Sequence, residues 1–162
     1  MYKILIGALA LISSSLVLAD YPERSIRLVV PFATGGTSEI VARSVANSLS
    51  TSLGQSVYVD NKPGGAGNIA MEEVKRANPD GYTLILGHVG TLAVNPALFG
   101  KKLPYDPNKD FAPVTLVAKV PNVIAVSEKS KYKTLADLVT DAKKNPGKIN
   151  YGSAGNGSAG HL

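Results

Sequence analysis

Residues 25–60 read SIRLVVPFATGGTSEIVARSVANSLSTSLGQSVYVD, and this stretch decides the fold. Its first six residues, 25–30, form a β-branched apolar run that is stopped by a proline and predicts a buried strand. Over residues 37–53 apolar side chains recur every four positions, which predicts a helix that ends at the following glycine. Residues 56–60 predict a second strand. A strand, a glycine-rich loop, a helix and a strand in this order favour a parallel α/β unit.

The start of the predicted helix has its own signals. Thr37 or Ser38 is expected to cap the helix, because a hydroxyl oxygen there accepts a hydrogen bond from a free backbone N–H. Glu39 falls in the first turn, where the positive end of the helix dipole favours an acid.

The same arrangement continues along the chain. Residues 61–68, NKPGGAGN, predict a second glycine-rich loop, and apolar positions within 70–77 outline a short helix. A third strand is expected at 82–87, YTLILG, and it leads into the loop sequence HVGT. Three such repeats predict a parallel sheet.

The remaining segments are less regular. Residues 95–110 contain three prolines and no clear period, and are interpreted as a connection across the surface. Two apolar segments follow within 114–127, separated by a proline. Thr134 then opens a predicted helix with Asp137 at the capping-box position. Residues 148–151, KINY, are interpreted as a short strand.

The first 19 residues predict a secretory signal peptide. Lys3 precedes an apolar run, and small Ala19 precedes the first polar residues, so cleavage is expected after Ala19 and the mature chain is expected in the periplasm. The alternative, a membrane anchor, is disfavoured because the apolar run, 4–17, is shorter than the ~20 residues a spanning helix needs.

Composition excludes several classes of protein. The chain has no cysteine, so it has no disulfide framework, no thiol-ligated metal site and no cysteine for a lipid anchor. Its net charge of +5 comes from scattered lysines and arginines. Because no basic run is interleaved with aromatics, a nucleic-acid surface is not expected.

Four glycine-rich loops follow the predicted strands: PFATGG, NKPGGAG, GHVGT and GSAGNGS. Loops after the carboxyl ends of parallel strands gather at one edge of the sheet, where open α/β folds bind ligands. Glycine lets backbone N–H groups approach a ligand, and hydroxyl and amide side chains add directional bonds. The set suits a small carboxylate held by neutral donors. Plain turn geometry remains the alternative for any single loop.

The chain offers little support for nucleotide binding or catalysis. GNGSAG, at 155–160, fits the dinucleotide pattern G-x-G-x-x-G, but the helix and the acid that the pattern requires do not follow it. His88 and His161 are the only histidines, and neither has metal-ligand spacing. No nucleophile elbow occurs. We therefore expect no enzyme, no metal and no cofactor, and keep an exported α/β enzyme or nucleotide-binding domain as the rival hypothesis.

Five stretches resemble one family: YPERSIRLVVPFATGGTSEIVAR, VDNKPGGAGNIA, NPDGYTLILG, NPALFGKKLPYDPNKDFAPV and PGKINYGSAGNGSAGHL. In this order and spacing they are similar to the tripartite tricarboxylate transporter substrate-binding proteins, also called the Bug family. The resemblance implies an α/β, type II periplasmic-binding-protein-like fold and a monomeric periplasmic receptor. Such receptors capture a small organic carboxylate and hand it to membrane transporter subunits of the tripartite tricarboxylate type.

The resemblance also implies a division of the chain. Residues 1–19 would be the signal peptide, 20–110 the first lobe without its C-terminal return, and 111–162 the start of a second lobe. Family members continue well beyond a loop like GNGS, so the chain is expected to be truncated and to leave the second lobe incomplete. A fragment without function, or a lobe that presents ligand to a sensor, are the alternatives this raises.

The ligand residues that the resemblance implies come from three of the loops. Two loops belong to the first lobe, and the third would donate to the carboxylate from a helix start in the second lobe. The predicted set is Phe32, Ala33, Thr34, Gly35, Gly36, Thr37, His88, Thr91, Ser153, Asn156, Gly157 and Ser158. Many family members have aspartate where this chain has Glu39, which concerns the helix cap more than the ligand.

Overall fold

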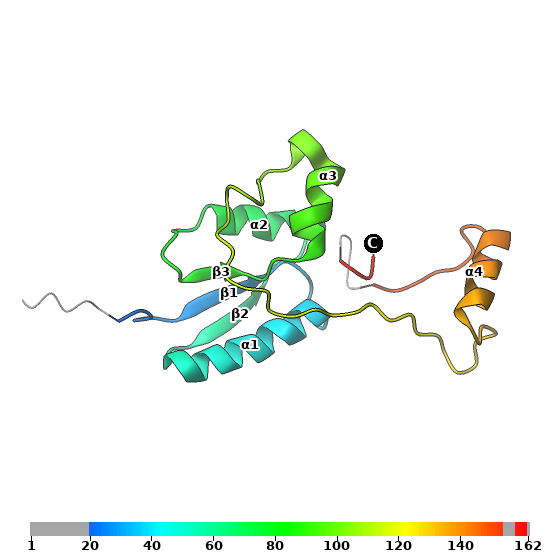
Figure 1. The fold of residues 1–162 in the computed structure, drawn as a ribbon, viewed down its shortest axis with the longest axis horizontal. Coiled ribbons are helices and arrows are strands. Elements are labelled where there is room, and N and C mark those ends of the chain that lie inside the picture. The colour runs from blue at the N-terminus through cyan, green and yellow to red at the C-terminus, as the bar shows by residue number, and fades with distance from the viewer. Residues whose placement is uncertain (1–19, 154–157, 162) are drawn as a thin grey trace, which may run out of the picture.

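The strand predicted from SIRLVV is the central strand of the sheet. The computed structural model describes residues 20–153 and 158–161. In it β1 (Ile26–Val30) pairs in parallel with both β2 (Val57–Asn61) and β3 (Thr83–Ile85), in the order β2-β1-β3. The predicted parallel sheet is confirmed. Figure 1 shows its carboxyl edge facing away from the chain's first described residues.

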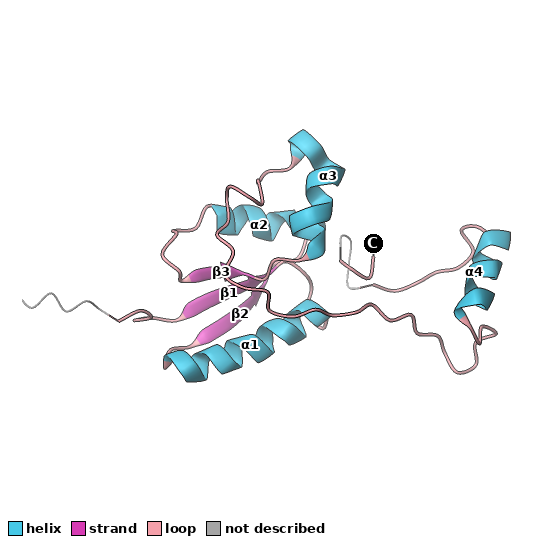
Figure 2. Ribbon diagram, in the orientation of Figure 1, coloured by secondary structure: helices cyan, strands magenta, loops and turns pink. Residues whose placement is uncertain are grey.

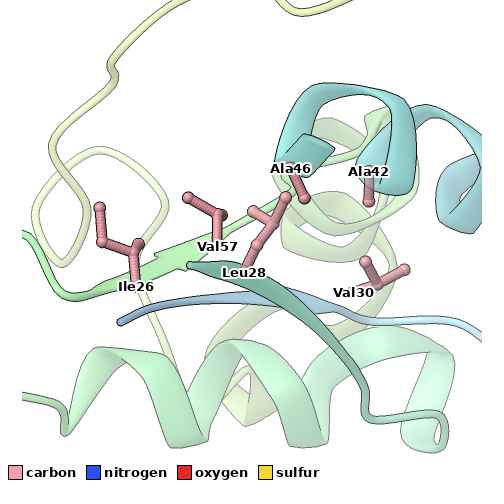
Figure 3. Close-up of a cluster of buried hydrophobic side chains, with 6 residues drawn as sticks. All are labelled: Ile26, Leu28, Val30, Ala42, Ala46 and Val57. Atoms are coloured by element: carbon pink, nitrogen blue, oxygen red, sulfur yellow. The ribbon is translucent and has the colours of Figure 1, made fainter. Parts of the chain in front are cut away.

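Helices cover both faces of this sheet. α1 (Thr37–Leu53) packs on one face and α2 (Asn68–Lys75) on the other, as Figure 1 shows. Alternate residues of β1 point to α1, where they meet small alanines that let the helix come close. Figure 3 shows this cluster: Ile26, Leu28, Val30, Ala42, Ala46 and Val57. Each fully buried branched side chain contributes about 1.5–3 kcal/mol, so this cluster fixes the helix on the sheet.

The ends of α1 differ in how they are capped. The C-terminal glycine, Gly54, has φ 65°, as predicted for a left-handed stop. At the other end Gly36 is the N-cap, and no side chain caps the helix, so the prediction of a Thr37 or Ser38 cap is wrong. The physical reason is that Thr37 and Ser38 are already the first two residues of the helix, past the N-cap position from which a hydroxyl accepts a first-turn N–H. Glu39 Oε2 accepts the N–H of Gly35, just before the helix, at 2.6 Å.

Residues 95–110 are more ordered than predicted. They form α3 (Asn95–Phe99) and a short 3₁₀ turn (Gly100–Lys102), and α3 follows a π-helical turn (Gly90–Val94). The side chains of Asn95 and Tyr105 are buried. The segment does run across the surface, since all its other residues are exposed or half-buried, but these two buried polar residues anchor it, which the sequence did not predict.

α4 (Leu135–Lys144) stands apart from the sheet, at the end of a long segment without helix or strand, as Figure 2 shows. Thr134 caps α4, and Asp137 completes the predicted capping box. The segment 148–151 is not a strand, contrary to prediction, because the described residues form only the sheet β2-β1-β3, to which this segment does not pair. The apolar residues of this region are exposed: Val114, Leu116, Val120, Val123, Ile124, Val126, Leu135 and Tyr151.

Within the described ranges, 20–153 and 158–161, no helix has both the length and the apolar character needed to cross a bilayer.

The carboxylate of Asp141 in α4 is expected to titrate far below the ordinary range. Tyr132 donates a hydrogen bond to it and Lys131 lies 3.0 Å away, and these contacts lower the pKa of Asp141 to about 2. The stabilisation from these contacts is present above the ordinary pKa of about 3.9 and is lost as the pH falls towards 2. Carboxyl ¹³C NMR should give a midpoint near 2.

Tyr132→Phe is the matched variant, because it removes only the donating hydroxyl. We expect the pKa of Asp141 to rise in this variant. An Asp141 midpoint near 4 in the unmodified chain would contradict the contact.

Candidate ligand-binding site

Three of the four predicted loops meet at the carboxyl edge of the sheet. The ring of Phe32 in the first loop packs edge-on against the ring of His88 in the third, with centroids 4.9 Å apart. Asn61, at the start of the second loop, donates from Nδ2 to the carbonyl oxygen of Phe32 at 3.0 Å. Gly67 packs closely against two residues of the other loops. A Cβ added to it would lie 3.2 Å from the side chain of Pro31 and 2.6 Å from that of Thr91. The prediction that these loops gather at one edge is confirmed.

The first loop presents backbone donors at the N-terminus of α1. Thr34, Gly35 and Thr37 are exposed. The first N–H groups of a helix have no partner inside it, and within the described part of the chain no acceptor bonds the N–H of Thr37 or Ser38. These amides, together with the helix dipole, make the edge suitable for an anion. The predicted Ala33 and Gly36 lie in the same loop.

Glu39 already occupies part of this helix end. Its carboxylate accepts the Gly35 N–H and pairs with Arg43, and these two contacts, the backbone bond first, lower the pKa of Glu39. The side chain is buried. The Gly35 N–H is therefore not available to a ligand carboxylate, which can bind only the amides and hydroxyls that follow Gly35. Glu39 stabilises the conformation of the loop.

His88 and Thr91 play different parts in the third loop. The His88 ring is half-buried and lies against Phe32. Thr91 is fully buried. Its hydroxyl oxygen lies 3.2 Å from the N–H of His88, which donates to it, and 3.1 Å from the carbonyl oxygen of His88, to which it can donate. Of the two predicted ligand residues, His88 is thus placed at the edge, while Thr91 braces the loop from behind.

A buried polar network supports the second and third loops, and sequence reasoning missed it. Asn95 donates from Nδ2 to the carbonyl of Ala66 at 2.9 Å and to Oδ1 of Asn68 at 2.7 Å. The Tyr105 hydroxyl donates to the carbonyl of Thr91 at 2.7 Å, and burial raises its pKa. No periodic signal marks these residues, because they belong to three separate segments that meet only in the fold.

Of the fourth predicted loop, GSAGNGS, and the residues that follow it, the described residues 158–161 lie on the same side of the sheet as the carboxyl edge in Figure 1. Their described contacts are with the C-terminal part of the chain: Asn122 donates to the carbonyl of Ala159 at 2.9 Å, and Tyr151 donates to the carbonyl of His161 at 3.1 Å. Ser153 is exposed, whereas Ser158 is buried. Asn156 and Gly157, like the predicted signal peptide, lie outside the described residues.

The donor set at the edge consists of amides, hydroxyls and one imidazole. Residues 20–153 and 158–161 contain no group of three His, Cys, Asp or Glu side chains that could hold a metal ion. Neutral donors of this kind suit a small anion, and a carboxylate most directly, because its oxygens accept several N–H and O–H bonds at once.

Comparison with known proteins supports this interpretation. Residues 41–162 match the family described as "Tripartite tricarboxylate transporter family receptor". A curated relative, "UPF0065 protein in tcbD-tcbE intergenic region" of Pseudomonas sp. (strain P51), is 37% identical over 164 residues, which cover 99% of this chain and 48% of the relative. The chain thus spans about half the length of the curated relatives it matches.

Two solved structures are similar in fold. One, "Structure of a periplasmic transporter", has a TM-score of 0.80 at 50% identity, over 85% of this chain and 46% of its own. The other, "R. palustris Rpa4515 with adipate", has a TM-score of 0.79 at 42% identity, over 86% of this chain and 46% of its own.

Proposed function

The chain belongs to the family of tripartite tricarboxylate transporter receptors and has its periplasmic-binding-protein type of α/β fold, and on this premise we propose that it acts as a periplasmic solute-binding protein for a small organic carboxylate. The observation that carries the proposal is the meeting of three donor-rich loops at the carboxyl edge of the sheet, beside the N-terminus of α1. The adipate in the similar solved structure indicates the chemical class of ligand.

The proposal extends to organisation and partners. Residues 20–110 form the first lobe and 111–162 begin the second, after removal of a signal peptide that ends at Ala19. The receptor is a monomer, and it delivers its ligand to membrane subunits of the tripartite type. The exposed apolar residues beyond 111 are consistent with a lobe that is incomplete in these 162 residues.

The donor set favours a receptor over an enzyme. Of the predicted site residues only His88 carries a side chain that could act as a general base. The described contacts of its ring are the Gly90 N–H at Nδ1 and the ring of Phe32, and neither is an acid or a nucleophile. Without a base and nucleophile pair, a bound carboxylate has no group to attack it. The rival, a nucleotide-binding domain, would need GNGSAG to open a helix, and its described residues, 158–160, lie in a turn.

Isothermal titration calorimetry of residues 20–162 with adipate and a panel of dicarboxylates and tricarboxylates tests the proposal. We expect saturable binding by at least one acid, a ligand-dependent rise in melting temperature and no chemical change in the ligand. A cooperatively folded protein that binds none of these acids, or one that converts a bound acid to product, would overturn the proposal.

Thr37→Asp is expected to move stability and binding in opposite directions. A carboxylate in the first turn of α1 stabilises the helix by about 0.3–1 kcal/mol through the dipole. The same charge repels a ligand carboxylate at this end, and binding should weaken at least tenfold. Thr37→Asn, which is neutral and of the same size, is the control. Equal binding by the two variants in the calorimeter would place the ligand elsewhere.

A further inference from the structure

The ring of His88 is fixed in one tautomer by its neighbours. Its Nδ1 accepts the backbone N–H of Gly90 at 3.0 Å, so this nitrogen carries no proton while the bond exists. In a neutral imidazole the proton then resides on Nε2. Burial lowers the pKa of the His88 ring, which also favours the neutral form.

The position of the ring is fixed as well. Phe32 packs edge-on against it at an interplanar angle of 74°. The Thr91 hydroxyl bonds the backbone N–H and carbonyl of His88, and Thr91 has no exposed surface into which it could move. None of the described contacts of the half-buried His88 ring uses its Nε2–H, so this N–H can donate to a ligand.

We propose that His88 is a neutral, pre-oriented donor whose Nε2–H binds the ligand carboxylate, while its Nδ1 holds the third loop through Gly90. This inference rests on the proposed function, since it names a contact of the same site. A neutral donor selects for a hydrogen-bond acceptor at this place without adding a positive charge that would attract any anion. It also couples the first and third loops, because Phe32 and His88 share the ring contact.

Two substitutions separate the two nitrogens. Asparagine places an acceptor oxygen near the position of Nδ1, so His88→Asn can keep the Gly90 bond but has no donor at the Nε2 position. Glutamine reaches further and places an N–H₂ donor near the position of Nε2, so His88→Gln keeps the donor and lacks the Gly90 acceptor. We expect His88→Asn to weaken dicarboxylate binding about tenfold or more, as for loss of one hydrogen bond to a charged group.

For His88→Gln we expect binding within a few-fold of the unmodified chain, with faster hydrogen exchange at the Gly90 amide. His88→Asn should keep the protection of that amide. Circular dichroism melts confirm that both variants fold. Adipate binding by His88→Asn equal to that of the unmodified chain, or weaker binding by His88→Gln than by His88→Asn, would overturn the inference.

The tautomer can be measured without any ligand. Two-bond ¹H–¹⁵N correlation spectra at neutral pH should show a protonated Nε2 and an unprotonated Nδ1 for His88. A proton on Nδ1, or a charged ring, would overturn the inference even if the protein binds carboxylates. If the spectra show the expected tautomer and binding by the unmodified chain fails for all acids, the proposed function is wrong, and the ligand contact falls with it.

Discussion

Gly67→Ala is expected to lower the free energy of unfolding by about 2–5 kcal/mol. Gly67 has φ 85°, a left-handed conformation that costs a residue with a Cβ about 1–2 kcal/mol. The new Cβ would also lie 2.6 Å from Cγ2 of Thr91, a distance that forces atoms apart, and overpacking of this kind costs about 1–3 kcal/mol. Thr91 cannot yield easily, because it is buried and bonded to His88. Urea unfolding followed by circular dichroism measures the loss.

Gly35→Ala is the matched control for this prediction. Gly35 has the same φ of 85°, but nothing lies within 4 Å of an added Cβ. This variant should show the conformational cost alone, about 1–2 kcal/mol. Equal losses in the two variants would mean that the three loops do not pack as closely as the structure shows.

Asn95→Asp is expected to destabilise the protein by several kcal/mol at neutral pH. The substitution replaces the donating Nδ2 by an oxygen that faces two acceptors, the carbonyl of Ala66 and Oδ1 of Asn68. Asn95 has no exposed surface, so the new carboxylate would be buried without a partner. Such a group has a folded-state pKa above its unfolded value, so the destabilisation should shrink as the pH falls and the acid is protonated.

Asn47→Asp provides the comparison on an exposed surface of α1. It makes the same chemical change where water solvates the charge, and we expect a change within about 0.5 kcal/mol. Unfolding curves at neutral and acid pH for both variants test the network. Similar stability of the two variants at neutral pH would show that Asn95 does not brace the loops.

The parts of the fold that the sequence predicts are those governed by local pattern. The apolar run of β1, the helix α1 and the capping box of α4 each follow from neighbouring residues, and each appears in the structure. The buried apolar residues of α1 are Ala42 and Ala46, one position beyond residues of the four-residue period. The parallel sheet follows from their order. The prediction of a short strand at 148–151 is wrong. A strand needs a neighbouring strand to pair with, and a short apolar run does not reveal whether such a neighbour exists.

The supports of the candidate site depend on distant residues, so they could not be predicted. Tyr105 reaches the carbonyl of Thr91 from 14 positions away, and Asn95 reaches Ala66 from 29 positions away. Glu39 lies in the first turn as expected, but its bond back to Gly35 was not predicted. The glycine loops themselves were visible in the sequence, because their composition and their place after strands are local properties.

The central claim is that the loops at the carboxyl edge of the sheet bind a small carboxylate. It is tested most directly by ¹H–¹⁵N NMR of residues 20–162 during titration with adipate or with the acid that binds best. The amides of Thr37, Ser38 and the loop from His88 to Gly90 should shift in a saturable manner, while those near Arg24, at the opposite edge, stay unchanged. Saturable shifts confined to other parts of the chain, or no shift at saturating acid, would contradict the claim.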